Sequence, residues 1–156
     1  MNIKFASIIE NLHPSMERLL EMKPVSYHSL PRDVPVQGIY LFSDGTDHLY
    51  VGRSNNMRQR FSQHCRPGSQ HNQAVFAFKI ARRQTGKELA AYTQGAESRK
   101  GLALDPVFSS AFSDAKGYLR RIDIRYVEEV DQRKQALLEI YCAIALNCSY
   151  NDFDTH

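Results

Sequence analysis

The pattern of apolar positions predicts helices at the start of the chain. Between residues 3 and 22, apolar side chains recur at three- and four-residue spacing, which is typical of an amphipathic helix. Pro14 divides this segment and is placed to open a second helical piece, because proline is tolerated in the first turn of a helix. Three prolines then disfavour helix in residues 23–37, where we expect an extended connector.

The next segment predicts a β-hairpin. Residues 38–42 and 48–52 are short runs rich in β-branched and aromatic side chains. Asp44-Gly45 lies between them, and this dipeptide favours a tight turn between antiparallel strands. Residues 119–127 alternate between apolar and polar and predict a third strand.

Helical patterns follow the hairpin. Asn55 or Asn56 can cap a helix that runs to about Cys65, and residues 74–84 carry a second apolar stripe. Residues 86–117 contain several glycines, a proline and mixed signals, so we expect an irregular or partly helical insertion there.

The last predicted helix, which Asp131 can cap, contains an isolated carboxylate. Positions 136–146 are apolar except for Glu139. Burying an unpaired charge costs several kcal/mol, so a buried Glu139 would need a cation partner, either a metal ion or an arginine. Alternatively, Gln132, Gln135 and Glu139 mark the solvent-exposed face of a helix whose other faces are buried. The spacing alone leaves both interpretations open.

Composition narrows the class of protein. The 156 residues are 42% hydrophobic and 24% charged, as in a globular domain, and no apolar run approaches the roughly 18 residues of a membrane span. The first twenty residues lack the continuous apolar core of an export signal. Cys65, Cys142 and Cys148 show no CxxC spacing, which favours free thiols in a reducing compartment. We therefore expect a cytoplasmic protein that does not associate with membranes.

The net charge of +3 conceals a concentrated basic block. Between residues 53 and 100, ten basic residues stand against two acidic ones, a local balance of +8. Such a block is typical of a surface that meets a polyanion, most commonly nucleic acid. A solvated basic face is the alternative that charge leaves open. The basic residues are Arg53, Arg58, Arg60, Arg66, Lys79, Arg82, Arg83, Lys87, Arg99 and Lys100.

Short motifs follow one another in a recognisable order. They are Gly38-Ile39-Tyr40, Tyr50-Val51-Gly52, Asn56-Met57 with Arg60 and His64 at fixed offsets, Leu138-Glu139, and Tyr150-Asn151. In this order they resemble the GIY-YIG endonuclease family, with valine in place of the usual isoleucine of the second motif. Each motif alone is weak evidence, whereas the ordered set is specific. The resemblance spans residues 38–151, with an insertion of about thirty residues.

The resemblance implies an α+β fold. A small three-stranded antiparallel sheet, made of the GIY/YIG hairpin and a third strand, would be flanked by helices. Residues 1–37 would be an N-terminal helical extension with a proline-rich connector. Residues 38–156 would be the nuclease domain, with its insertion at about 84–118. The implied activity is a metal-dependent DNA endonuclease that hydrolyses phosphodiester bonds by a one-metal mechanism.

The resemblance also assigns roles to site residues. Tyr40 is our first choice for activating the attacking water and Tyr50 our second, although tyrosines on strands also serve as core packing. Arg60 would stabilise charge on the scissile phosphate, because its planar fork matches phosphate oxygens. Glu139 would hold one Mg²⁺ or Mn²⁺. His64 would orient a tyrosine or contact phosphate, with an ordinary helix-end histidine as the alternative.

The expected partner is DNA, double-stranded or branched. RNA is the less favoured substrate. The sequence does not decide whether the protein forms a homodimer. A second hypothesis is a nucleic-acid-binding module of the same fold that has lost cleavage, and a third is a purely structural partner-binding protein. Asn151 would brace the site or touch the DNA backbone. The residues predicted to contact DNA are Arg53, Arg58, Lys79, Arg82, Arg83, Arg99, Lys100 and Asn151.

Overall fold

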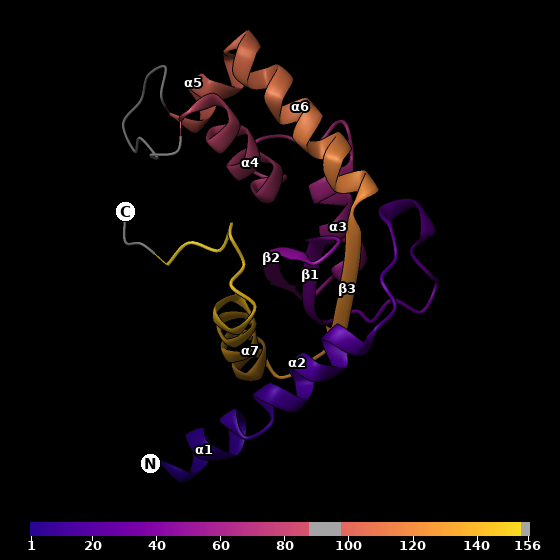
Figure 1. Ribbon diagram of the computed structural model, residues 1–156, viewed down its shortest axis with the longest axis vertical. Coiled ribbons are helices and arrows are strands. Elements are labelled where there is room, and N and C mark those ends of the chain that lie inside the picture. The colour runs from indigo at the N-terminus through magenta and orange to yellow at the C-terminus, as the bar shows by residue number, and fades with distance from the viewer. Residues whose placement is uncertain (88–97, 154–156) are drawn as a thin grey trace. The chain divides into compact units, whose positions relative to one another are not determined.

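The computed structural model describes residues 1–87 and 98–153, which fall into two compact units. We call Met1–Arg60 with Ile122–Asn151 the sheet unit. We call Phe61–Arg121, grouped with the last residues of the chain, the helical unit. Figure 1 shows the elements of both units.

The sheet unit contains a three-stranded antiparallel sheet with strand order β2-β1-β3. The strands are β1 (Gly38–Asp44), β2 (Asp47–Ser54) and β3 (Asp123–Glu128). Gly45 lies in the turn between β1 and β2 with φ +59°, a left-handed conformation that glycine adopts without a steric penalty. The predicted hairpin and the α+β fold class are therefore confirmed.

Helices α2 (Leu12–Glu21) and α7 (Gln132–Ala145) pack with the sheet around an apolar core. They form because their apolar residues fall on one helical face, as Leu12, Met16 and Leu19 do in α2. Helix α1 (Ile3–Ile9) precedes α2, so the two predicted N-terminal helices are confirmed. The buried core consists of Leu12, Met16, Leu19, Ile39, Leu41, Val51, Leu138, Cys142 and Cys148.

The outer edge of β3 is covered by the proline-rich connector. Val25 exchanges two backbone hydrogen bonds with Ile124, with N···O distances of 3.0 and 2.7 Å. A short 3₁₀ helix, Tyr27–Ser29, follows in the same connector. Because unpaired strand edges can template unwanted association, this bridge protects β3.

The helical unit contains α4 (Val75–Thr85), α5 (Arg99–Leu104) and α6 (Pro106–Arg121). Helix α3 (Met57–Cys65) begins in the sheet unit and ends in the helical unit. The Phe78 ring of α4 packs against Phe108 and Phe112 of α6, with ring centroids 4.9 and 5.8 Å apart. The predicted helices at residues 55–65 and 74–84 are confirmed.

The described part of the insertion is largely helical. Residues 99–104 and 106–121 form helices, which agrees with the partly helical alternative. The third strand begins at Asp123 rather than at residue 119, so its predicted start is wrong. Pro106 is the first residue of α6, where a missing N–H costs no helical hydrogen bond. A buried apolar stripe stabilises the helix and runs through Phe108, Phe112, Ala115 and Leu119.

The cysteines are free and buried, as predicted from their spacing. Burial raises the pKa of the Cys142 and Cys148 thiols to about 12. Burial likewise raises the pKa of Cys65 to about 12, although the nearby Arg120 charge acts to lower it. The thiols are therefore protonated and pack as small apolar side chains.

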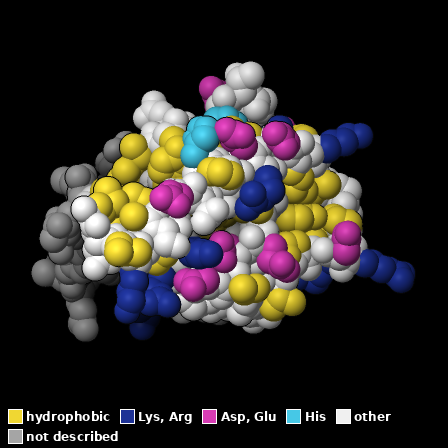
Figure 2. All heavy atoms as spheres, turned by 90° about the horizontal axis from the view of Figure 1, so that it is seen from below, with side chains coloured by type: hydrophobic (Ala, Val, Ile, Leu, Met, Phe, Trp, Pro, Cys, Tyr) yellow, Lys and Arg dark blue, Asp and Glu magenta, His cyan; other side chains and the backbone are white. Residues whose placement is uncertain are grey.

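The surface combines apolar and charged side chains. Figure 2 shows one face of the molecule, on which hydrophobic side chains (yellow) gather in groups between acidic (magenta) and basic (dark blue) ones. Exposed apolar residues of the sheet unit include Ile3 and Phe5 of α1 and Ile140 and Ile144 of α7. Within the described part of the chain, no helix has the length and apolar character needed to cross a membrane.

Candidate active site

Two tyrosines from neighbouring strands lie on one face of the sheet. Because side chains alternate along a strand, Tyr40 and Phe42 point away from the face that carries Ile39 and Leu41. The Tyr40 ring meets Phe42 edge to face at 5.9 Å and lies tilted against Tyr50 at 6.4 Å between centroids. Tyr40 is 1% exposed and Tyr50 is 9% exposed. Both rings therefore pack in the core, and this packing is independent of any catalytic role of their hydroxyl groups.

The glycines of the two strand motifs allow close approaches. Gly52 is paired with Tyr40 across the hairpin, and a Cβ atom at Gly52 would overlap the Tyr40 hydroxyl and ring. A Cβ atom at Gly38 would overlap the carbonyl oxygen of Val127 in β3. Any larger residue would displace the Tyr40 ring or separate β1 from β3, which explains both glycines physically.

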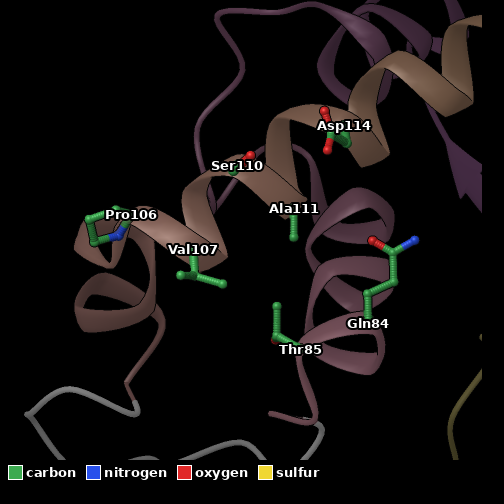
Figure 3. A pocket seen from close by; sticks show the side chains of 7 residues that line it. All are labelled: Gln84, Thr85, Pro106, Val107, Ser110, Ala111 and Asp114. Carbon is green, nitrogen blue, oxygen red and sulfur yellow. The ribbon is translucent and has the colours of Figure 1, made fainter.

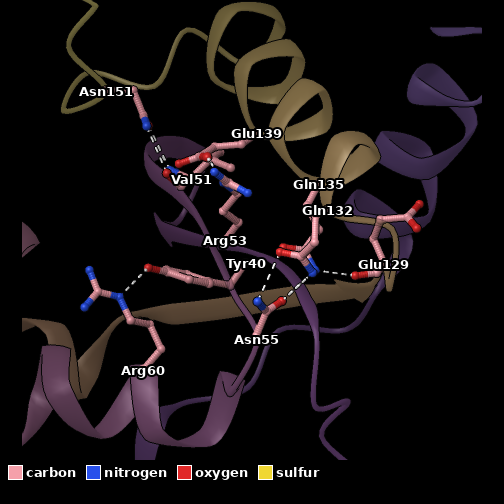
Figure 4. Close-up of polar contacts among 10 residues, drawn as sticks. All are labelled: Tyr40, Val51, Arg53, Asn55, Arg60, Glu129, Gln132, Gln135, Glu139 and Asn151. Atoms are coloured by element: carbon pink, nitrogen blue, oxygen red, sulfur yellow. Dashed lines mark hydrogen bonds and ion pairs between the residues drawn. The ribbon is translucent and has the colours of Figure 1, made fainter. Parts of the chain in front are cut away.

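Helix α3 brings Arg60 to the tyrosines. The Asn56 side chain accepts a hydrogen bond from the Gln59 backbone N–H at 3.2 Å, so the cap predicted for this helix is present. One turn later, Arg60 Nε donates to the Tyr40 hydroxyl oxygen at 3.3 Å (Figure 4). Arg60 also hydrogen-bonds with the Tyr50 hydroxyl. One guanidinium therefore organises both phenols.

Burial controls the protonation of the two tyrosines. Burial has the largest effect on the Tyr40 pKa and raises it. The positive charge of Arg60 lowers the same pKa, but by less. The pKa of Tyr50 is raised by the same cause, again against Arg60, with the Glu139 charge adding to the rise. Burial thus outweighs the effect of Arg60 on the Tyr40 pKa. Both phenols are neutral in the free protein.

Glu139 meets an arginine from β2. Val51 and Arg53 share the face of β2 that packs against α7, because they are two residues apart on a strand. Arg53 Nε lies 3.2 Å from Glu139 Oε2, with the two side chains 42% and 30% exposed (Figure 4). Of the two cation partners left open by the sequence, the free protein supplies the arginine.

A network of side-chain amides joins α7 to the end of β2. Asn55 and Gln132 exchange two hydrogen bonds of 3.0 and 2.7 Å. Gln135 Nε2 donates to the Glu129 carbonyl oxygen at 2.6 Å and to Asn55 Oδ1 at 3.3 Å (Figure 4). Gln135 is 1% exposed, so the prediction of a solvent-exposed face for this stripe of α7 is wrong at Gln135. Sequence reasoning missed the network, although the polar spacing of Gln132, Gln135 and Glu139 was its visible signal.

Asn151 braces the outer edge of β2. Its Oδ1 accepts a hydrogen bond from the Val51 N–H at 2.8 Å, and its Nδ2 donates to the Val51 carbonyl oxygen at 2.9 Å. The neighbouring Tyr150 N–H donates to the Leu49 carbonyl oxygen at 2.9 Å. The side chain thus pairs with β2 as another strand would, which favours bracing over contact with the DNA backbone.

His64 lies one helical turn after Arg60 on α3 and belongs to the helical unit. It is fully buried, and its ring packs edge-on against Phe76 with centroids 6.5 Å apart. Aromatic packing of this kind suits the alternative of a structural histidine at the end of the helix.

The basic residues predicted to contact DNA differ in how far they are exposed to solvent. Arg82 is 6% exposed, its guanidinium lies 4.9 Å from the Phe78 ring centroid, and its Nη1 donates to the Lys87 carbonyl oxygen at 2.9 Å. We therefore correct the prediction for Arg82, because a side chain buried in this way is not placed to meet a phosphate backbone. Five others, namely Arg53, Arg58, Arg83, Arg99 and Lys100, are exposed, and Lys79 is half-buried.

An open groove lies between the end of α4 and α6 in the helical unit (Figure 3). Its volume is about 540 Å³, and its lining residues are Gln84, Thr85, Pro106, Val107, Ser110, Ala111 and Asp114. None of these residues is basic, and Asp114 carries a negative charge. The groove is therefore unsuited to a phosphate, and it contains no residue of the motifs.

One comparison with known proteins finds a similarity over part of the chain. The model of the GIY-YIG catalytic domain matches residues 36–103. No curated protein sequence and no solved structure shows significant similarity to the chain. The matched range contains Tyr40, Tyr50, Arg60 and His64. Glu139 lies outside it, and its charge acts to raise the pKa of both tyrosines. The family implies an endonuclease acting on nucleic acid. The match confirms the resemblance carried by the motifs, and residues 36–103 are similar to the GIY-YIG catalytic domain.

Proposed function

We propose that the protein is a metal-dependent DNA endonuclease that hydrolyses phosphodiester bonds with a single divalent metal ion. One observation carries the proposal. Tyr40, Tyr50 and Arg60 share hydrogen bonds, and the Glu139 carboxylate lies near enough to influence the pKa of both tyrosines. Phosphodiester hydrolysis needs such a combination of a water-activating group, a cation for phosphate and a ligand for a metal ion.

The donor atoms suit one hydrated Mg²⁺ or Mn²⁺. Among residues 1–87 and 98–153, no group of three or more His, Cys, Asp or Glu side chains gathers into a metal site. Mg²⁺ commonly takes one or two carboxylates and completes its octahedron with waters and substrate phosphate oxygens. Glu139, partly exposed on α7, fits that role, and a two-metal site would need more carboxylates. When bound, the ion would polarise the phosphate and neutralise the leaving oxygen.

Arg60 would link the phosphate to the water-activating group. Arg60 hydrogen-bonds the hydroxyl groups of Tyr40 and Tyr50, and the planar fork of its guanidinium matches phosphate oxygens. Burial lowers the pKa of Arg60, but the two tyrosines raise it by more, so the guanidinium stays charged. In its deprotonated form, Tyr40 would take a proton from the attacking water as negative charge moves onto the phosphate, and the phenol would become neutral again.

A binding module without cleavage is the second candidate. It is favoured by the exposed basic residues of the helical unit, Arg83, Arg99 and Lys100, which would serve binding with or without chemistry. The raised pKa of Tyr40, caused mainly by burial, also means that this phenol rarely loses its proton in the free protein.

Incubation of the purified protein with supercoiled plasmid, branched DNA and RNA separates the two candidates. Each substrate is tested with Mg²⁺, with Mn²⁺ and with EDTA. The endonuclease predicts metal-dependent cleavage of DNA that the Tyr40→Phe variant lacks, while both proteins bind the substrate equally. Tight binding without cleavage on every substrate and metal would support the binding module.

A further inference from the structure

We propose that Arg53 is a positioning residue that holds Glu139 in the metal-free protein and transfers to a substrate phosphate when a divalent cation binds. The exchange would make the binding of metal and DNA cooperative. This inference rests on the proposed function, because it takes Glu139 as the metal ligand.

The ion pair stands between two braced pieces of backbone. On one side, β2 is paired with β1, and its outer edge is held by Asn151 through both backbone groups of Val51. On the other side, the first turn of α7 is tied to Asn55 through the buried Gln135. The backbone positions of Arg53 and Glu139 are therefore well fixed, and only their side chains need to move in the exchange.

The partial exposure of the pair permits the exchange. With the side chains 42% and 30% exposed, water and ions reach both charges. Ion pairs in such surroundings contribute little stability, so a stronger partner for either charge can separate them. A fully buried pair would resist separation, because each charge would be left without solvent.

Charge makes the exchange necessary. A divalent cation at the Glu139 carboxylate would stand close to the guanidinium on Oε2, and like charges at that distance repel. Arg53 must therefore leave when the cation binds. A phosphate near the same site would attract the released guanidinium, whose fork matches its oxygens. By linkage, a phosphate that draws Arg53 away raises the affinity of Glu139 for the cation by the same factor.

The direct test follows the Nε–H signal of Arg53 by NMR, with assignment by its loss in Arg53→Gln. Addition of Mg²⁺ should move the signal to the position that it has in Glu139→Gln without metal. Arg133 is the matched control, because its Nε lies 4.0 Å from Asp131 Oδ1 beside the same helix and its signal should stay in place. An Arg53 signal that stays unchanged while Glu139 binds Mg²⁺ would overturn the exchange.

A second test measures Mn²⁺ affinity by calorimetry. Arg53→Gln should bind Mn²⁺ roughly three- to tenfold more tightly than the parent, because the competing cation is gone, whereas Arg133→Gln should match the parent. A short DNA duplex with a non-hydrolysable backbone should raise the Mn²⁺ affinity of the parent and have a smaller effect on Arg53→Gln. Equal effects of DNA on both proteins would contradict the coupling.

The tests separate failure of the inference from failure of the proposed function. If Glu139→Gln binds Mn²⁺ as the parent does, Glu139 is not the metal ligand, and both the proposed metal site and the exchange are wrong. If Glu139→Gln loses Mn²⁺ binding while Arg53→Gln leaves affinity, NMR signal and DNA coupling unchanged, the metal site stands and the exchange alone is wrong.

Discussion

The sheet unit and the helical unit distribute charge in different ways. Met1–Arg60 and Ile122–Asn151 contain ten basic and eleven acidic residues, a net charge of −1. Phe61–Arg121 contains ten basic and four acidic residues, a net charge of +6. The hydrogen-bonded tyrosines, Arg60 and Glu139 all belong to the nearly neutral unit. The difference indicates that the candidate chemistry and most of the attraction for a polyanion come from different parts of the chain.

Polar side chains hold the backbone in both units. In the sheet unit, amides of Asn55, Gln135 and Asn151 bond to one another or to the backbone, and Arg125 Nε donates to the Met22 carbonyl oxygen at 3.0 Å. In the helical unit, lysine and arginine side chains bond to the backbone. Lys116 Nζ donates to the carbonyl oxygens of Pro67 and Ser69 at 2.7 and 2.8 Å, and Arg120 Nη1 donates to that of Cys65 at 2.6 Å. Some of the positive charge that could be read as a DNA-binding surface is therefore structural.

Among single changes in the sheet unit, Tyr40→Phe should have a very large effect on cleavage. Removal of the hydroxyl deletes the water-activating group, so the single-turnover rate should fall on the order of a hundredfold or more. The ring that packs against Phe42 remains, so the melting temperature should change little. Tyr126→Phe is the matched control, because Tyr126 is paired with Tyr40 in the neighbouring strand. If Tyr40→Phe cleaves DNA at the parent rate, Tyr40 does not activate the attacking water.

The pH dependence of cleavage defines the role of Tyr40 further. Burial, with a smaller contribution from the neighbouring Tyr50, raises the Tyr40 pKa above that of a free phenol, so the deprotonated fraction is small at neutral pH and grows as pH rises. The single-turnover rate at saturating Mg²⁺ should therefore increase about tenfold per pH unit between about pH 7 and pH 9. Tyr50→Phe should keep this slope. A flat profile in the parent would mean that Tyr40 acts without losing its proton.

Neutralising the exposed basic residues of the helical unit tests the other side of the comparison. The triple variant Arg83→Gln, Arg99→Gln, Lys100→Gln should bind DNA more weakly, and its slope of log affinity against log salt should decrease by roughly one for each phosphate that is no longer neutralised. Cleavage at saturating DNA should match the parent, because the tyrosine cluster is untouched. A large loss of the saturated rate with unchanged affinity would reverse the division of roles.

A smaller effect is expected when a structural cation of the helical unit is removed. Lys116→Met leaves the carbonyl oxygens of Pro67 and Ser69 without this donor, which should lower the free energy of unfolding by about 1–3 kcal/mol. Denaturant unfolding measures the change, with Lys100→Met as the exposed control that should unfold like the parent. The DNA affinity of folded Lys116→Met should match that of the parent, because this lysine is buried. A clear loss of DNA affinity would assign Lys116 to the binding surface.

Local signals in the sequence predicted much of the fold. The Asp44-Gly45 turn, the Asn56 cap and the Asp131 cap each rest on residues within a few positions, and all three are present in the structure. Helix α6 was expected only as part of a partly helical insertion and without bounds, because its initial Pro106 and internal Gly117 weaken the helical pattern, although its apolar spacing is regular.

The motif order proposed Tyr40, Arg60 and Glu139 as residues of the candidate site. It could not show which atoms of these side chains make contact in the folded protein. The Arg53–Glu139 ion pair and the burial of Arg82 depend on residues brought together by tertiary packing, for which charge and spacing carry no local signal. The same limit applies to the Tyr40 pKa, because burial, its largest cause, is a property of the folded core.

Glu139→Ala tests whether the sheet unit contains a one-metal nuclease site. The measurement is the single-turnover rate of cleavage of a DNA substrate that the parent cuts, at saturating Mg²⁺, with Glu10→Ala as an exposed control on the same unit. A metal site at Glu139 predicts a loss on the order of a hundredfold or more, because the ion that neutralises the developing phosphate charge loses its protein ligand. DNA affinity in metal-free buffer should be retained or increased, since a negative charge near the phosphate is removed. Cleavage within a few-fold of the parent would contradict the metal site and, with it, the proposed mechanism.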